Sequence, residues 1–160
     1  MTAAPNQSFA LIPASYVYLR RGDEVLLQRR AGTGYMDGHW VAGAAGHIEP
    51  RETAQAAAVR EAMEELGVTI APGALEALTV MHRTDGTSNP REQRVDWFWT
   101  STEWTGTPRI IEPNKCSGLG WFQMTALPDP MPDYERAVLI PWARNALPVT
   151  TTHGFLTSDS

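Results

Sequence analysis

Cysteine is almost absent from this sequence of 160 residues, because Cys116 is the only one. A single thiol cannot form a disulfide within the chain, so a small secreted domain held by disulfides is excluded. Residues 1–7 contain neither a basic start nor an apolar stretch, the two features of a secretory leader. We therefore expect a reducing, cytoplasmic setting.

Long hydrophobic runs and basic patches are also missing. Charged residues or prolines interrupt every apolar segment before it reaches the ~20 residues that a membrane-spanning helix needs, so we expect no membrane partner. The chain has 13 Lys and Arg against 18 Asp and Glu, a formal net charge of -5. This balance argues against duplex nucleic acid as a partner. A small anionic substrate stays compatible, since a bound cation can reverse the local field.

The hydrophobic fraction of 42% and the charged fraction of 19% are typical of one globular domain. We predict this domain over residues 14–147. Residues 1–13 are polar and contain proline, and residues 148–160 are rich in threonine and serine. Both ends are therefore predicted to be flexible segments.

Alternating strand and helix patterns predict an α/β fold. Residues 15–20 and 24–29 resemble two strands of a hairpin, and short β-branched or aromatic segments predict strands over 75–82, 94–100 and 120–123. The clearest helix spans 52–66, which lacks glycine and proline, and Gly67 stands at its expected end. A second helix is predicted over 133–145, where Pro141 should kink or end it.

Three glutamates gather on the first helix. Glu61, Glu64 and Glu65 are three and four positions apart and therefore share a face, while the opposite face is predicted to pack through Val59, Ala62, Met63 and Leu66. Like charges at this spacing cost ~0.2–0.5 kcal/mol per pair. A solvated acidic surface is the commoner explanation of such a face. The neighbouring acids Glu49 and Glu52 and the preceding small-residue segment 40–46 favour instead a site for Mg²⁺ or Mn²⁺, which prefer oxygen ligands.

The same residues follow a known signature. Gly46, Glu52, Arg60-Glu61, Glu64-Glu65 and Gly67-Val68 stand at the spacing of the Nudix box, so the chain resembles the MutT-like Nudix hydrolases over about residues 14–146. The resemblance implies an α/β/α sandwich with a mixed β-sheet and a loop–helix–loop box. It also implies hydrolysis of a phosphoanhydride in a nucleoside diphosphate linked to another group, with Mg²⁺ as cofactor and Mn²⁺ as a possible substitute.

The resemblance also assigns roles to individual residues. Glu61, Glu64 and Glu65 are the implied catalytic metal ligands, and a backbone carbonyl of Ala45 or Gly46 is implied to complete the coordination sphere. Glu52 would orient water or metal, and Arg60 would hold the carboxylates in place. The general base differs among family members and stays open.

Two departures from the signature concern the loop. Segment 40–46 lacks the proline that many family members carry before the box and is one residue longer, and Arg51 stands where a glycine is frequent. In addition, Ala62 is smaller than the usual bulky aliphatic residue.

Candidate substrate and further metal residues lie outside the box. Aromatic rings can stack on a base, and arginines can bind phosphate. The candidates for substrate binding are Tyr35, His82, Arg83, Arg94 and Trp97. Glu112 is a candidate for an additional metal ligand, with Glu92, Asp96 and Glu103 as competitors. In a strand only alternate positions face one side, so a single set of the aromatic residues 97–99 can line a cleft. For His82 and Cys116 a structural role is the commoner explanation.

Two other functions remain open from the sequence. The same fold could bind a nucleotide as a non-catalytic sensor, or the acidic helix could be purely structural. The intact set of box acids favours hydrolysis over both. The sequence leaves open which nucleotide-like substrate is used and whether the chain pairs into a homodimer.

Overall fold

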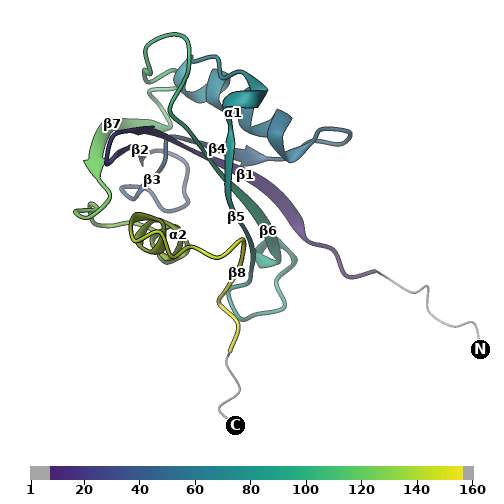
Figure 1. Cartoon of the computed structure of the whole chain (residues 1–160). Helices are drawn as coiled ribbons and strands as arrows, with labels where there is room; N and C mark the ends of the chain where they lie inside the picture. The colour runs from purple at the N-terminus through teal and green to yellow at the C-terminus, as the bar shows by residue number, and fades with distance from the viewer. Residues whose placement is uncertain (1–7, 157–160) are drawn as a thin grey trace, which may run out of the picture.

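The computed structural model describes residues 8–156 and contains one mixed sheet with a helix on each face (Figure 1). Of the two segments predicted to be flexible, residues 1–7 and 157–160 lie outside the described residues, whereas Ile12 and Pro13 already belong to β1. None of the described helices is long and apolar enough to cross a membrane. In chain order the elements are β1 (Ile12–Arg21), β2 (Glu24–Arg30), β3 (Trp40–Ala42), β4 (Ala44–His47), α1 (Ala54–Leu66), η1 (Pro72–Ala74), β5 (Glu76–Arg83), η2 (Pro90–Glu92), β6 (Arg94–Ser101), β7 (Cys116–Gln123), α2 (Asp133–Ala143) and β8 (Thr150–His153).

The sheet is divided because β1 changes its partner along its length. Its residues 14–17 pair antiparallel with β4, whereas only its last two residues pair with β2. On its other side β1 runs parallel to β6, which continues to β5 and β8. β2 pairs separately with β3 and β7. Two groups of strands therefore diverge from β1, and a wedge opens between β2 and β4.

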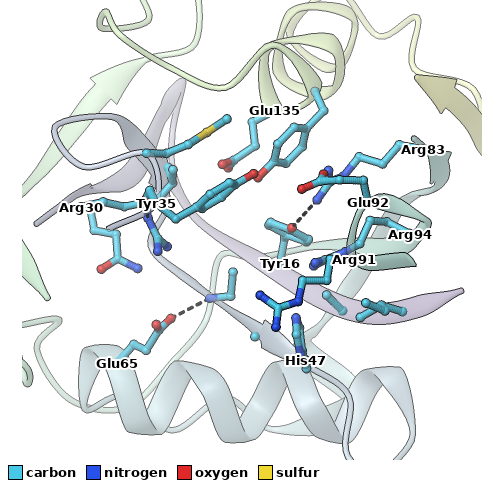
Figure 2. Close-up of a pocket in the computed structure, with 18 residues that line it drawn as sticks. Tyr16, Arg30, Tyr35, His47, Glu65, Arg83, Arg91, Glu92, Arg94 and Glu135 are labelled. Carbon is cyan, nitrogen blue, oxygen red and sulfur yellow. Dashed lines mark hydrogen bonds between the residues drawn. The ribbon is translucent and has the colours of Figure 1, made fainter. Parts of the chain in front are cut away.

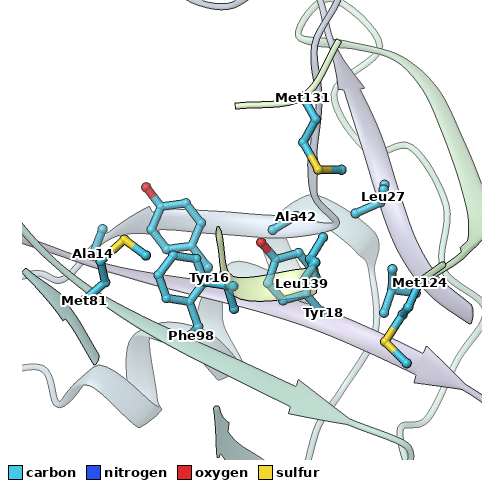
Figure 3. Packing of buried hydrophobic residues seen from close by; sticks show 12 residues of the cluster. Ala14, Tyr16, Tyr18, Leu27, Ala42, Met81, Phe98, Met124, Met131 and Leu139 are labelled. Atoms are coloured by element: carbon cyan, nitrogen blue, oxygen red, sulfur yellow. The ribbon is translucent and has the colours of Figure 1, made fainter. Parts of the chain in front are cut away.

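Hydrophobic cores lie on both faces of β1, which explains its nearly continuous burial. Tyr16 and Tyr18 pack toward α2 together with Phe98 of β6, and Figure 3 shows this cluster with Leu139 of α2. The rings of Tyr16 and Phe98 stack with centroids 4.7 Å apart. Val17 and Leu19 point to the other face and pack against α1. The predicted α/β/α sandwich with a mixed sheet is thus confirmed.

Helix α1 ends where the sequence predicts. The Thr53 side chain accepts a hydrogen bond from the Ala56 amide at the start, and Gly67 takes a left-handed conformation at the end. Ala58, Ala62 and Leu66 face the sheet. The prediction that Met63 packs in the core is wrong, since its side chain is 47% exposed. Residues spaced by four make the contact, and Met63 lies about 100° around the helix from Ala62.

The sheet continues past residue 147, the predicted end of the domain. Thr150–His153 form β8, which pairs in parallel with β5. The Thr79 hydroxyl donates to the Val149 carbonyl at 3.1 Å and lies 3.1 Å from the Thr151 hydroxyl. Part of the segment predicted to be flexible is therefore held at the sheet edge. The second predicted helix ends at Ala143 and keeps Pro141 within its last turn.

Candidate active site

The acids of α1 meet the backbone of β4 at Gly46. A Cβ atom placed on Gly46 would overlap the carboxylate of Glu61, so only glycine allows this approach. Glu61 is 9% exposed, and burial raises the pKa of its carboxyl although Arg60 opposes the shift. The close approach brings the backbone of β4 against a desolvated carboxylate.

Arg60 connects the acids of the box. Its Nε and Nη2 atoms donate to the two oxygens of Glu52 at 2.7 and 2.9 Å. Its Nη1 donates to Glu61 at 2.7 Å and to Glu64 at 3.2 Å. Nη2 also donates to the His47 carbonyl at 3.1 Å, which fixes the loop between β4 and α1. The hydrogen bond from Arg60 lowers the pKa of Glu52, so this carboxyl is ionised at neutral pH. The structure places Arg60 between Glu52 and Glu61.

Glu65 lies deeper than Glu64. Its Oε2 accepts a hydrogen bond from the Ala45 amide at 2.6 Å. Burial raises the pKa of Glu65 to about 8, and the charges of Glu61 and Glu112 add to this shift. By contrast, the side chain of Glu64 is 57% exposed. The box thus presents one open and two desolvated carboxylates.

These residues fit a divalent cation in their chemistry. The available donors are carboxylate oxygens and the backbone of Ala45 and Gly46, the hard ligands that Mg²⁺ and Mn²⁺ prefer. Burying two carboxylates is costly without a positive charge. Within residues 8–156 no three acidic, histidine or cysteine side chains converge in the arrangement of a metal site. Glu112, half-exposed on its loop, lines a polar cavity of about 470 Å³ together with Glu65.

Arg51, at the position where glycine is frequent in the family, has a φ of 67°. The chain thus keeps the left-handed backbone that glycine favours, despite the substitution. The Glu52 amide donates to the Glu49 carbonyl, and the Glu49 amide donates to the Glu52 carboxylate. The turn before α1 is therefore closed in spite of this departure.

A second, larger cavity of about 560 Å³ occupies the wedge between β2 and β4 (Figure 2). It shares Gln28, Arg30 and Glu65 with the polar cavity, so the two lie next to each other beside the box. The cavity is lined by apolar and aromatic side chains, by arginines, and by three acids. The polar and aromatic members are Tyr16, Gln28, Arg30, Tyr35, His47, Glu65, Arg83, Arg91, Glu92, Arg94, Tyr134 and Glu135.

Three of the five residues predicted for substrate binding line this cavity, namely Tyr35, Arg83 and Arg94. His82 and Trp97 do not. His82 alternates with Met81 and Arg83 along β5 and therefore points to the opposite face, where its ring contacts Phe155 at 4.7 Å between centroids. Trp97 alternates in the same way with Asp96 and Phe98. Because successive side chains of a strand point to opposite faces of the sheet, His82 and Trp97 point away from the cavity.

Arg83 organises one wall. Its guanidinium pairs with the buried Asp96, donates to the Tyr16 hydroxyl at 3.3 Å and lies 3.8 Å above the Tyr134 ring. Arg94 approaches the other oxygen of Asp96 at 3.8 Å. Burial raises the pKa of Tyr16 to about 12, so its hydroxyl stays protonated. The wall therefore combines fixed positive charge with aromatic surface.

Several cavity residues were not predicted from the sequence, above all Glu135. It is fully buried, yet it lies on α2 among apolar residues. A signal was present, since Glu135, Val138 and Leu139 share the i, i+3, i+4 spacing of the inward face. An acid on such a face is unusual and marks a candidate site.

Comparisons with known proteins agree with this geometry. The family model described as the NUDIX domain matches residues 11–143. A MutT NUDIX hydrolase from Burkholderia pseudomallei has a similar structure, with 26% identity and a TM-score of 0.72 over 82% of this chain and 97% of that one. The E. coli ORF135 protein has 22% identity and a TM-score of 0.67, over 88% and 94%. An ADP-ribose pyrophosphatase from Streptococcus suis has 19% identity and a TM-score of 0.58, over 89% and 99%.

Proposed function

Because this chain belongs to the Nudix family, we propose that it hydrolyses a phosphoanhydride bond in a nucleoside diphosphate linked to another group, with Mg²⁺ as its cofactor. The observation that carries the proposal is the position of Glu65. It lies in the box and also lines both cavities, so a ligand that extends through the two cavities passes the metal-ligand candidates.

The residues around Glu65 suit each part of such a substrate. Arg30 and Lys115 line the polar cavity and supply positive charge for phosphate oxygens. Glu61, Glu64 and Glu65, with the backbone near Gly46, would hold Mg²⁺. The bound metal would stabilise charge on the phosphate groups and acidify the attacking water. A glutamate within hydrogen-bond reach would take the proton of that water.

Arg60 and Glu52 have a supporting role in this proposal. Their paired hydrogen bonds set the position of the carboxylates before substrate binds. Glu112 is close enough to raise the pKa of Glu65 and is the proposed ligand from outside the box. The cytoplasmic setting and a homodimer remain predictions.

The test is a panel of nucleoside triphosphates, ADP-ribose and nucleotide sugars, assayed for phosphate products with Mg²⁺ or with EDTA. We expect turnover of one substrate class with Mg²⁺ only, reduced at least about 100-fold in Glu64→Gln and Glu65→Gln. Glu76→Gln, at an exposed position of β5, is the matched control and should keep full activity. Metal-dependent nucleotide binding without turnover would instead indicate a sensor. Turnover that persists in EDTA would contradict the proposal.

A further inference from the structure

The wedge cavity contains a buried carboxyl oxygen without a partner. Glu135 has no exposed surface, and its Oε2 makes no hydrogen bond within the described structure. Its Oε1, in contrast, accepts from the Tyr18 hydroxyl at 2.6 Å and from the Ala42 amide at 2.7 Å. An unpaired buried carboxyl oxygen is costly, so its retention calls for an explanation.

The orientation of this carboxyl group is fixed from two sides. Tyr18 belongs to β1 and Ala42 to β3, and both are completely buried. Because both donate to the same oxygen, the other oxygen is directed away from them. Glu135 is part of the cavity lining together with Tyr35, and Figure 2 draws both among the residues around the cavity. The Oε2 atom of Glu135 therefore has a fixed position in the cavity lining.

The surroundings restrict what this oxygen can bind. Apolar and aromatic side chains dominate this part of the cavity, including Val41, Met36 and the rings of Tyr16 and Tyr134. Such walls suit a flat ring. The arginines of the lining, which are Arg30, Arg83, Arg91 and Arg94, outnumber its acids, which are Glu65, Glu92 and Glu135, so the lining does not favour a cationic ligand. The best partner is therefore a neutral N–H donor on an aromatic ring, within a molecule that carries anionic groups elsewhere.

We infer that Glu135 is a specificity-determining residue whose Oε2 accepts a hydrogen bond from the exocyclic amino group of a nucleobase. The inference rests on the proposed function and narrows its substrate class to nucleotides of cytosine, adenine or guanine. Nucleotides of uracil or hypoxanthine present a carbonyl at the corresponding position, which would face the carboxylate oxygen and be rejected.

Access to Glu135 involves the loop between β2 and β3. Since Oε2 has no exposed surface, a ligand reaches it only if a lining side chain gives way. Tyr35 is the most exposed aromatic ring of the lining, at 47%, and it sits on the segment 31–39. This segment is tied to β2 by hydrogen bonds from Arg30 to the Tyr35 carbonyl and the Thr33 hydroxyl. A displaced Tyr35 ring could then stack on the bound base.

The substitution Glu135→Gln makes a sharp test. The Ala42 amide can only donate, so the glutamine oxygen must take the place of Oε1 and the NH₂ group the place of Oε2. An acceptor for the base thereby becomes a donor without a change in shape. Asp133→Asn is the matched control, because Asp133 is an exposed acid in the same turn of α2.

Equilibrium binding is measured by calorimetry at pH 8 with Mg²⁺, using nucleoside monophosphates, which lack a phosphoanhydride. The pairs CMP and UMP, and AMP and IMP, differ at the base edge by an amino group against a carbonyl. For the wild type and Asp133→Asn we expect about tenfold or greater preference for the amino member of at least one pair. In Glu135→Gln this preference should disappear or reverse.

Equal affinities within both pairs for the wild type would overturn the inference without any variant, as would absence of binding. An unchanged preference in Glu135→Gln would overturn it as well. The proposed function is tested separately. A preference for the amino-bearing base without hydrolysis of any substrate would refute only the hydrolase. Hydrolysis together with a base preference that Glu135→Gln leaves unchanged would refute only the role of Glu135.

Discussion

At the scale of single residues, the geometry of the Nudix box depends on the close contact between the Gly46 backbone and the Glu61 carboxylate. The overlap that a Cβ atom would cause involves the end of the Glu61 side chain rather than the backbone. Glu61 can therefore yield by rotation, and the sheet need not move. The main consequence of an added Cβ atom is then that the Glu61 carboxylate leaves its position in the site.

Gly46→Ala is accordingly expected to fold and to lose catalysis. A ligand displaced by about 1 Å can cost roughly 100-fold in rate, and we expect a loss of at least about that size in kcat with Mg²⁺. Gly73→Ala is the control, since nothing lies within 4 Å of the added atom. Steady-state kinetics and thermal unfolding check both variants. Full activity in Gly46→Ala would show that the position of Glu61 is not critical.

At the scale of elements, the predictable parts are those whose local signals and tertiary contacts agree. Helix α1 has a threonine cap, an alanine-rich body and a terminal Gly67, and its bounds were predicted within two residues at the start. Strand β4 was missed because its small residues have low strand propensity, and β3 was missed because three residues are too few to show an alternating pattern. Strand β8, with three threonines and a histidine, has no alternating apolar pattern, and pairing with β5 holds it in place.

The part of the candidate site that lies on α1 was predictable from the sequence, whereas most of the cavity was not. The box glutamates lie on one helix, so their spacing alone places them on neighbouring positions of its surface. The cavity instead depends on which faces of β1, β5 and β6 point into the wedge, and this register is absent from local patterns. Of two neighbouring residues predicted to bind substrate, Arg83 therefore lines the cavity and His82 does not. Glu135 was missed because burial of an acid is rare.

Removal of β8 tests how much this edge strand contributes to the stability of the fold. A chain that ends at Leu147 loses the hydrogen bonds between β8 and β5, including those of the Val80 and Thr84 amides with the Val149 and His153 carbonyls. We expect the free energy of unfolding to fall by about 2–4 kcal/mol, at ~0.5–1.5 kcal/mol per hydrogen bond. Urea unfolding measures it, and a chain ending at Leu156 retains every described residue as the control. Identical curves would mean that β8 adds no stability.

At the scale of the whole molecule, buried carboxyl groups make stability depend on pH. Burial raises the pKa of Glu135 from about 4.5 to about 7, although Tyr18 and Ala42 oppose the shift. The folded state therefore holds a proton that the unfolded chain releases between these values. Stability is highest at low pH in this window and decreases as pH rises through about 7.

The contribution of Glu135 can be isolated by comparison with Glu135→Gln, which does not titrate. Between pH 4.5 and pH 8 the wild type should lose on the order of 3 kcal/mol of unfolding free energy relative to this variant, at about 1.4 kcal/mol per pKa unit. Denaturant unfolding in EDTA at several pH values gives the difference. Other buried acids, such as Glu65 and Asp96, titrate in both proteins and cancel in it. A difference independent of pH would show that the pKa of Glu135 is not raised.

The change of partner along β1 divides the sheet into two leaves that share one strand. One leaf carries β4 and, through it, the glutamates of α1, whereas the other carries Gln28 and Arg30 of β2. A molecule bound in the wedge touches both leaves at once. For the proposed substrate, the angle between the leaves would set the distance from the metal-ligand candidates of α1 to Arg30 of β2. Substitutions can change the angle between β2 and β4 without contacting the ligand. Such substitutions would change the length of substrate that the site accepts.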